Sequence, residues 1–198
     1  MKKHIIITSI ITSIMILSGC ASVDNDNQNK EVKREEQTLW QVLDKSGEII
    51  NYLDEDNADV KDIKNIVTKH KAIIDNREPE NIMYNEEVSL YTEEFKKILI
   101  DNRYEEALNS MYYDNEMSLV SGNIIWYIST FDESEEYCKV TIDSEFEIKH
   151  SKEKYLKNSN LKLNNTYVEQ RIIYFKKQNG EWLISNITKS ALNEKSKT

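Results

Sequence analysis

Apolar and polar residues follow four successive patterns along the chain. From Ile5 to Leu17 the residues are almost wholly apolar, and only Ser and Thr interrupt the run. Residues 21–37 are mostly polar and show no period. From Leu39 to Leu99 apolar residues recur near helical spacing, and from Leu119 onward they alternate with polar residues, as in strands. This order, helices first and strands afterwards, predicts an α+β fold.

Two helices are expected between residues 38 and 78, packed together as a hairpin. Thr38 and Gln41 have the spacing of a capping box. The apolar residues that follow them are Leu39, Leu43, Ile49, Ile50 and Leu53. Asn57 is placed to cap the second helix, and Pro79 ends it. The stripe of this second helix consists of Val60, Ile63, Val67, His70 and Ile74, widened by Ile66 and Ile73.

A further helix is predicted after Asn85, because Glu86 and Glu87 suit the positive end of a helix dipole. Its apolar stripe consists of Val88, Tyr91, Phe95, Ile98 and Leu99. Asp101 and Asn102 break this helix, and a short helix over residues 104–112 follows.

The second half of the chain predicts an antiparallel sheet of about four strands. Residues 137–150 alternate most sharply, and the apolar face consists of Cys138, Val140, Ile142, Phe146 and Ile148. The pair Asn179-Gly180 predicts a tight hairpin between the last two strands. A two-residue loop there would put Phe175 opposite Ile184 and Ile172 opposite Ile187.

The start of the chain has the layout of an export signal. Lys2 and Lys3 precede the apolar run, which is shorter than the ~20 residues that a membrane-spanning helix needs. Leu17-Ser18-Gly19-Cys20 then resembles the lipobox of bacterial lipoproteins. The resemblance implies cleavage after Gly19 and attachment of a diacylglyceryl group to Cys20, which becomes the mature N-terminus. The alternative is an ordinary signal peptide, or a short membrane helix, with a coincidental cysteine.

Lipid on Cys20 implies a protein held at the extracytoplasmic face of the cell membrane, because two acyl chains suffice for stable anchoring. The composition favours a Gram-positive source. Cleavage would remove Lys2 and Lys3 and so change the formal charge from −9 to −11. Such an acidic body is repelled by anionic lipid and by nucleic acid, so no nucleic-acid partner is expected.

Five segments are expected on these grounds: a signal peptide at 1–19, a tether at 20–37, the helical hairpin at 38–78, a helix-and-sheet domain at 79–190 and a polar tail at 191–198. The polar tether lacks the apolar residues needed to offset its ordering entropy. Residues 85–188, with their helix, short helix and closing hairpin, resemble the nuclear-transport-factor-2-like (cystatin-like) domains. That resemblance implies a cone-shaped domain in which a long helix lies in the hollow of a curved sheet.

Residue types that carry chemistry are scarce after Cys20. Cys138 falls on the apolar face of a strand, where a reactive thiolate is not expected. His70 lies on an apolar helix stripe, and His150 closes the strand of Cys138 at a distance of ~40 Å. An acidic run starting at Asp54 fails the EF-hand pattern. No catalytic residue, no metal site and no cofactor are therefore expected, and Asp143, Glu145 and Glu147 are expected to be solvated.

Aromatic residues are more numerous than one face of a small sheet requires. They are Tyr112, Tyr113, Trp126, Tyr127, Phe131, Tyr174, Phe175 and Trp182. They either form the core or line a hollow that could bind a small molecule. The favoured hypothesis is a non-catalytic lipoprotein that binds another envelope protein or protects the cell from an external factor, a layout similar to immunity and exclusion lipoproteins. The alternative function is small-molecule binding in an apolar cavity, and an enzyme is not expected.

Overall fold

A computed structural model describes residues 40–195 of the chain. The expected signal peptide, the lipobox, Cys20, the tether and the capping residue Thr38 lie outside the described residues. Within residues 40–195 no helix is long and apolar enough to cross a bilayer.

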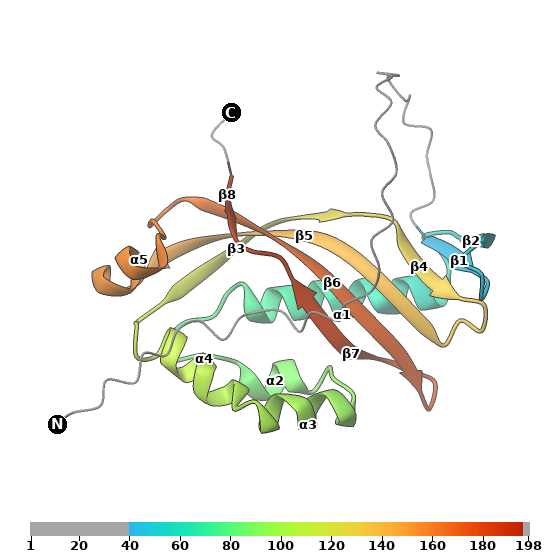
Figure 1. Ribbon diagram of the computed structural model, residues 1–198, viewed down its shortest axis with the longest axis horizontal. Coiled ribbons are helices and arrows are strands. Elements are labelled where there is room, and N and C mark those ends of the chain that lie inside the picture. The colour runs from blue at the N-terminus through green and yellow to red at the C-terminus, as the bar shows by residue number, and fades with distance from the viewer. Residues whose placement is uncertain (1–39, 196–198) are drawn as a thin grey trace, which may run out of the picture. The chain divides into compact units, whose positions relative to one another are not determined.

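The described chain consists of five helices and eight strands (Figure 1). The helices are α1 (Ala58–Ile74), α2 (Tyr84–Val88), α3 (Glu93–Asp101), α4 (Tyr104–Tyr112) and α5 (Glu153–Ser159). The strands are β1 (Trp40–Leu43), β2 (Ile49–Leu53), β3 (Ser118–Trp126), β4 (Ser129–Asp132), β5 (Tyr137–His150), β6 (Thr166–Gln178), β7 (Glu181–Lys189) and β8 (Asn193–Glu194).

All strands belong to one sheet of the order β2-β1-β4-β5-β6-β7, in which β3 also pairs with β5 and β8 with β6. Every pairing is antiparallel except that of β1 with β4, which is parallel. The α+β class is therefore confirmed, but the sheet is mixed, larger than the four strands expected, and neither closed nor strongly curled. The additional strands are β1, β2 and β8, and residues 118–132 form two strands, β3 and β4.

The first helix expected between residues 38 and 53 is wrong, because β1 and β2 form a hairpin there. The turn is fixed by Asp44, whose Oδ1 accepts hydrogen bonds from the backbone N–H groups of Ser46 at 2.8 Å and Glu48 at 2.9 Å. Gly47 adopts a φ of 86°, which a side chain would strain. Trp40 and Val42 point into the core with the two-residue period of a strand.

The second expected helix is confirmed as α1. The side chain of Asn57 accepts hydrogen bonds from Asp59 N and Val60 N and so caps the helix. The fully buried side chains on its stripe include Val60, Ile63 and Val67. They pack against strand residues such as Val140 in one core cluster.

The next predicted helix is divided into α2 and α3 by a contact with the sheet. Thr92 N donates to Ile184 O, and Ile184 N donates to Leu90 O, each at 2.9 Å. These bonds draw residues 90–92 beside β7, and the Thr92 side chain then caps α3 through Phe95 N. The short helix over residues 104–112 is confirmed as α4.

The hairpin of β6 and β7 turns at Asn179 and Gly180, as predicted, with φ of 54° and 85°. Phe175 lies opposite Ile184, as expected. Ile187, however, lies opposite Ile173, and Ile172 lies opposite Thr188. A bulge after Ile184 inserts one residue into β7 and shifts the register beyond it.

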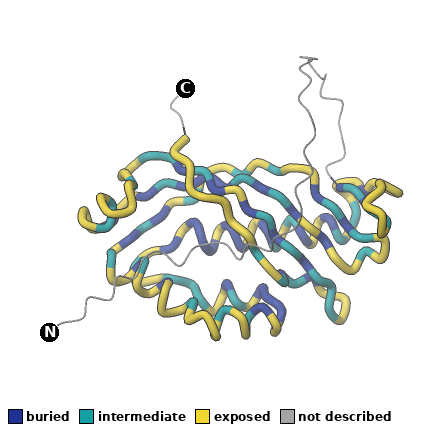
Figure 2. The backbone as a smooth tube through the Cα atoms, viewed as in Figure 1, coloured by how far each residue is buried: buried dark blue, intermediate teal, exposed yellow. Residues whose placement is uncertain are grey.

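Helix α1 lies across one face of the sheet, and α2, α3 and α4 lie beyond it (Figure 1). Figure 2 shows buried positions along the inner side of α1 and exposed positions on the outer helices and the hairpin tips. The main core joins α1 to β1, β4, β5, β6 and β7, and a smaller one packs α4 against β3, β5 and β6. Helix α1 and its side chains therefore cover the face of the sheet on which a cone-shaped hollow was expected.

Candidate functional site

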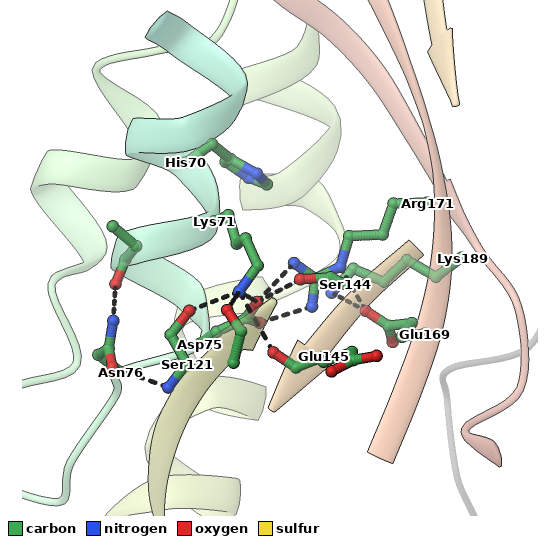
Figure 3. A network of polar contacts seen from close by, with 12 residues as sticks. His70, Lys71, Asp75, Asn76, Ser121, Ser144, Glu145, Glu169, Arg171 and Lys189 are labelled. Atoms are coloured by element: carbon green, nitrogen blue, oxygen red, sulfur yellow. Dashed lines mark hydrogen bonds and ion pairs between the residues drawn. The ribbon is translucent and has the colours of Figure 1, made fainter. Parts of the chain in front are cut away.

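The last turns of α1 carry polar side chains into the protein interior. His70, Lys71 and Asp75 are only 1%, 5% and 1% exposed. They are buried, although they are polar, because they lie on the face of the helix that packs against the sheet. Figure 3 shows Lys71 and Asp75 directed toward polar side chains of the strands. Burying ionised groups is unfavourable unless they are paired, so their partners decide what the group can do.

Asp75 pairs with Arg171 of β6, and both are almost fully buried. Arg171 donates to the two carboxylate oxygens of Asp75 at 2.6 and 3.2 Å, a bidentate pair. Ser144 Oγ donates to Asp75 Oδ2 at 2.5 Å, and Arg171 Nε donates to Glu169 Oε2 at 2.6 Å. We call Lys71, Asp75, Ser144, Glu169 and Arg171 the central polar cluster.

Lys71 completes the central polar cluster on the side of β3. Its ammonium lies 3.2 Å from Asp75 Oδ2 and donates to Ser121 Oγ at 2.5 Å. It also donates to the backbone oxygens of Gly122 at 3.1 Å and Glu145 at 3.2 Å. One lysine thus ties the end of α1 to both β3 and β5.

A second group of buried polar residues surrounds Glu87 of α2. Arg77 Nη2 donates to Glu87 Oε2, and the hydroxyl groups of Tyr91 and Tyr104 donate to Glu87 Oε1 at 2.5 and 2.9 Å. The Nε2 of His70 lies 2.8 Å from the Tyr91 hydroxyl and 3.8 Å from Glu87 Oε1. Because the Tyr91 proton already goes to Glu87, His70 donates from Nε2 to the Tyr91 oxygen.

Burial and pairing determine the charge of these groups. Burial alone would raise the pKa of Glu87, but contact with His70 and the Arg77 guanidinium lower it to about 2. Burial lowers the pKa of His70, so this imidazole is neutral at pH 7. Burial would also raise the pKa of Asp75, yet Arg171 and Ser144 bring it below its usual value. Glu87 and Asp75 are therefore carboxylates at neutral pH.

Sequence reasoning missed this buried polar interior. His70, Tyr91 and Glu87 bring a histidine within reach of a buried carboxylate, which is an arrangement that acid–base catalysis uses. All three are 1–2% exposed, however, so a substrate cannot touch them in this structure. The available signal was the pair Glu169 and Arg171, two charges on the same face of β6 as the apolar Ile173 and Phe175, because charged residues on a buried face indicate buried partners.

Residues singled out from the sequence are placed as follows. Cys138 is buried in the main core, where burial raises the pKa of its thiol well above the usual value. His150 lies on the surface at the other end of β5, so the two are not brought together. Glu145 was expected to be solvated and is instead 4% exposed, because Lys195 and Asn123 cover its carboxylate. Asp143 and Glu147 are half-buried.

The aromatic residues divide between core and surface. Tyr112, Phe131, Phe175 and Trp182 are buried, Trp126 and Tyr174 are half-buried, and Tyr113 and Tyr127 are exposed. Among the hollows of the described structure, one of about 400 Å³ is lined in part by Phe131, Tyr174 and Phe175, and another of about 470 Å³ is lined in part by Glu145, Glu147 and Lys195. Neither is lined by any residue of α1.

Exposed apolar side chains gather on the edge strand β2. Ile49, Ile50 and Tyr52 are 45%, 56% and 54% exposed within a strand in which only Leu53 is buried. Apolar side chains at this density, on a strand whose outer edge is unpaired within the described residues, are typical of a binding surface. Within residues 40–195 no group of His, Cys, Asp and Glu has the arrangement of a metal site.

No protein-family description and no curated protein matches the sequence. The fold is similar to the intermembrane space region of the chloroplast protein ARC6, with 14% identity and a TM-score of 0.48 over 68% of this chain and 98% of that one. It is also similar to an IcmL-like type IV secretion system protein from Legionella pneumophila, with 7% identity and a TM-score of 0.40 over 69% of this chain and 93% of that one. A third similar structure is the hexachlorocyclohexane dehydrochlorinase LinA Type2, with 10% identity and a TM-score of 0.39 over 69% of this chain and 88% of that one. Nothing about ligands or partners of this chain follows from similarities of this size.

Proposed function

We propose that this chain is a lipoprotein, anchored through Cys20 at the outer face of the cell membrane, whose folded domain binds another envelope protein without catalysing a reaction. Such binding would suit a protein that protects the cell from an external factor. The proposal includes a nuclear-transport-factor-2-like scaffold, which is supported by a helix lying across a mostly antiparallel sheet.

The observation that carries the proposal is the exposed apolar edge strand β2. Its side chains Ile49, Ile50 and Tyr52 are about half exposed, whereas Trp40 and Val42 on the neighbouring strand are buried. The hairpin is thus held by β1 and presents β2 outward. A stable hairpin with an apolar outer strand is suited to contact with another protein chain.

The arrangement of the ionisable interior supports a structural rather than a catalytic role. Asp75, Glu87 and Arg171 are at most 2% exposed, and each is held by hydrogen bonds from or to neighbouring side chains. A group so held would have to lose its partners before it could act on a substrate. Buried polar atoms of the described side chains all have hydrogen-bond partners. The network therefore fixes α1 against the sheet.

Crosslinking on intact cells tests the proposal. We expect the wild-type chain to give a reproducible crosslinked product with one envelope protein, identified by mass spectrometry. Replacing Cys20 with serine should release the chain from the membrane and abolish the product. Ala21→Ser, next to the attachment site, is the matched control and should retain both. If the wild-type chain yields no specific product, or if Cys20→Ser leaves it unchanged, the proposed function is wrong.

A further inference from the structure

The outer edge of β2 has no strand beside it in the described part of the chain, where β2 pairs with β1 alone. In an antiparallel strand, alternate residues direct N–H and C=O away from the paired neighbour. The outer edge of β2 therefore offers a row of main-chain donors and acceptors. Natural edge strands protect such a row with a charge, a proline, a β-bulge or a short length. Ile49-Ile50-Asn51-Tyr52-Leu53 contains no charge and no proline. It is short, and a register shift leaves Ile50 without a partner on β1, so the free row of main-chain groups covers only about five residues.

Negative charges stand at both ends of this strand. Glu48 precedes it, and Asp54 follows it. The lysines nearby in the sequence form ion pairs with other carboxylates. Lys45 Nζ lies 3.0 Å from Glu133 Oε1, and Lys61 Nζ lies 2.9 Å from Asp56 Oδ1. Among residues 40–195 no cation lies within ion-pair distance of Glu48 or Asp54, so the ends of β2 remain negative.

The charges of Glu48 and Asp54 favour some partners of β2 over others. Two copies of β2 paired about a two-fold axis at Asn51 would put Glu48 of each copy opposite Asp54 of the other. Like charges directly opposite one another on paired strands are destabilising. An anionic lipid surface would be repelled in the same way. A chain with cations at these places would instead be attracted.

We propose that β2 binds an extended segment of another protein, added to the sheet as a further strand, with apolar residues at its centre and Lys or Arg at both ends. Main-chain hydrogen bonds would supply affinity, and the exposed Ile50 and Tyr52 would contact the apolar residues of the segment. The flanking cations would lie beside Glu48 and Asp54. This inference rests on the proposed function and specifies the chemistry of the partner.

Three synthetic peptides test the inference on the full chain. The first is Lys-Lys-Val-Thr-Val-Thr-Val-Lys-Lys, the second replaces its four lysines with glutamates, and the third replaces the central valine with proline. Binding is measured by fluorescence anisotropy, and the contacted segment is identified by amide hydrogen exchange. We expect the lysine peptide to bind at least about tenfold more tightly than the other two. Exchange should slow at residues 49–52, and raising the salt should weaken binding.

Two variants with equal changes of charge locate the site. Ile50→Lys places a like charge at the proposed edge and should weaken binding of the lysine peptide by about tenfold. Ile98→Lys is the matched control, because Ile98 is 49% exposed but lies on α3. It should leave binding unchanged. Melting temperatures of both variants should equal that of the wild type, since both side chains are exposed.

Several results would overturn the inference. They are the absence of binding by the lysine peptide, equal binding by the glutamate or proline peptide, protection of another segment, and equal weakening by Ile98→Lys. A dimer that Ile50→Lys dissociates would assign the edge to a second copy instead. An envelope protein that still crosslinks to Ile50→Lys on cells would leave the proposed function standing and place its contact elsewhere.

Discussion

Replacing Arg171 with leucine removes the cation that joins Asp75, at the end of α1, to strand β6. The guanidinium makes three hydrogen bonds to carboxylates, at 2.6 and 3.2 Å to Asp75 and at 2.6 Å to Glu169. Asp75 is 1% exposed and would be left as a buried carboxylate that has lost its principal partner. Leucine would fill much of the volume, so the main loss is electrostatic.

The expected loss is large. Removing one partner of a buried ion pair destabilises a protein by about 3–5 kcal/mol. Lys71 remains 3.2 Å from Asp75 and Lys189 remains 3.5 Å from Glu169, so part of the charge stays compensated. We therefore expect a loss of about 3 kcal/mol in the free energy of unfolding, from a total of about 5–15 kcal/mol for a domain.

Urea unfolding followed by tryptophan fluorescence measures this loss. The control is Lys61→Ala, which breaks the exposed pair with Asp56 and should cost less than about 1 kcal/mol. A second variant, Asp75→Asn, should destabilise the wild type. In the Arg171→Leu background it should be nearly neutral or stabilising, because it removes the uncompensated charge.

Two outcomes would refute this reasoning. One is a loss below about 1 kcal/mol for Arg171→Leu, which would mean that the buried pair barely exceeds a surface pair. The other is simple additivity of Arg171→Leu and Asp75→Asn, because residues in direct contact are expected to show a coupling energy.

Three further predictions concern single positions. Because the folded-state pKa of Glu87 is about 2, below the usual 4.5, its contribution of about 3 kcal/mol is present above pH 4.5 and lost as the pH falls toward 2. Glu87→Gln should therefore lower the free energy of unfolding at pH 7, and in urea titrations between pH 4.5 and 2 this free energy should fall less steeply than in the wild type. Equal pH dependence of the variant and the wild type in this range would contradict the prediction. Asn57→Ala should cost about 1 kcal/mol in thermal unfolding, as the loss of a helix cap, and an unchanged melting temperature would refute the cap. Gly180→Ala should cost about 1 kcal/mol because of its φ of 85°, whereas an increase in stability would contradict the strained turn.

Sequence periodicity predicted the long elements because each buries one continuous face. The stripe of α1, the alternation of β5 and the Asn179-Gly180 turn each combine a pattern with a local signal. The β1–β2 hairpin was mistaken for a helix because its strands have only four and five residues. Apolar runs of that length fit the 3.6-residue period of a helix as well as the two-residue period of a strand. The Asp44 turn that decides between them depends on side-chain hydrogen bonds.

The polar interior could not be derived from periodicity, because its contacts join distant segments. Asp75 and Arg171 are 96 residues apart in the sequence. Each taken alone has the character of a surface residue, and only the pairing of α1 with β6 explains their burial. The bulge in β7 is a similar case, since it shifts the partner of Ile187 without a change in the apolar pattern. His70 was correctly placed on the buried stripe, but its contacts with Tyr91 and Glu87 depend on the break between α2 and α3.

Attachment of lipid to Cys20 is the central claim, and metabolic labelling with radioactive palmitate in the native host tests it most directly. The account predicts that the wild-type chain takes up label and fractionates with membranes. It also predicts that Cys20→Ser takes up none and appears in the soluble fraction. An unlabelled wild-type chain, or a Cys20→Ser variant bound to the membrane as firmly as the wild type, would contradict the account.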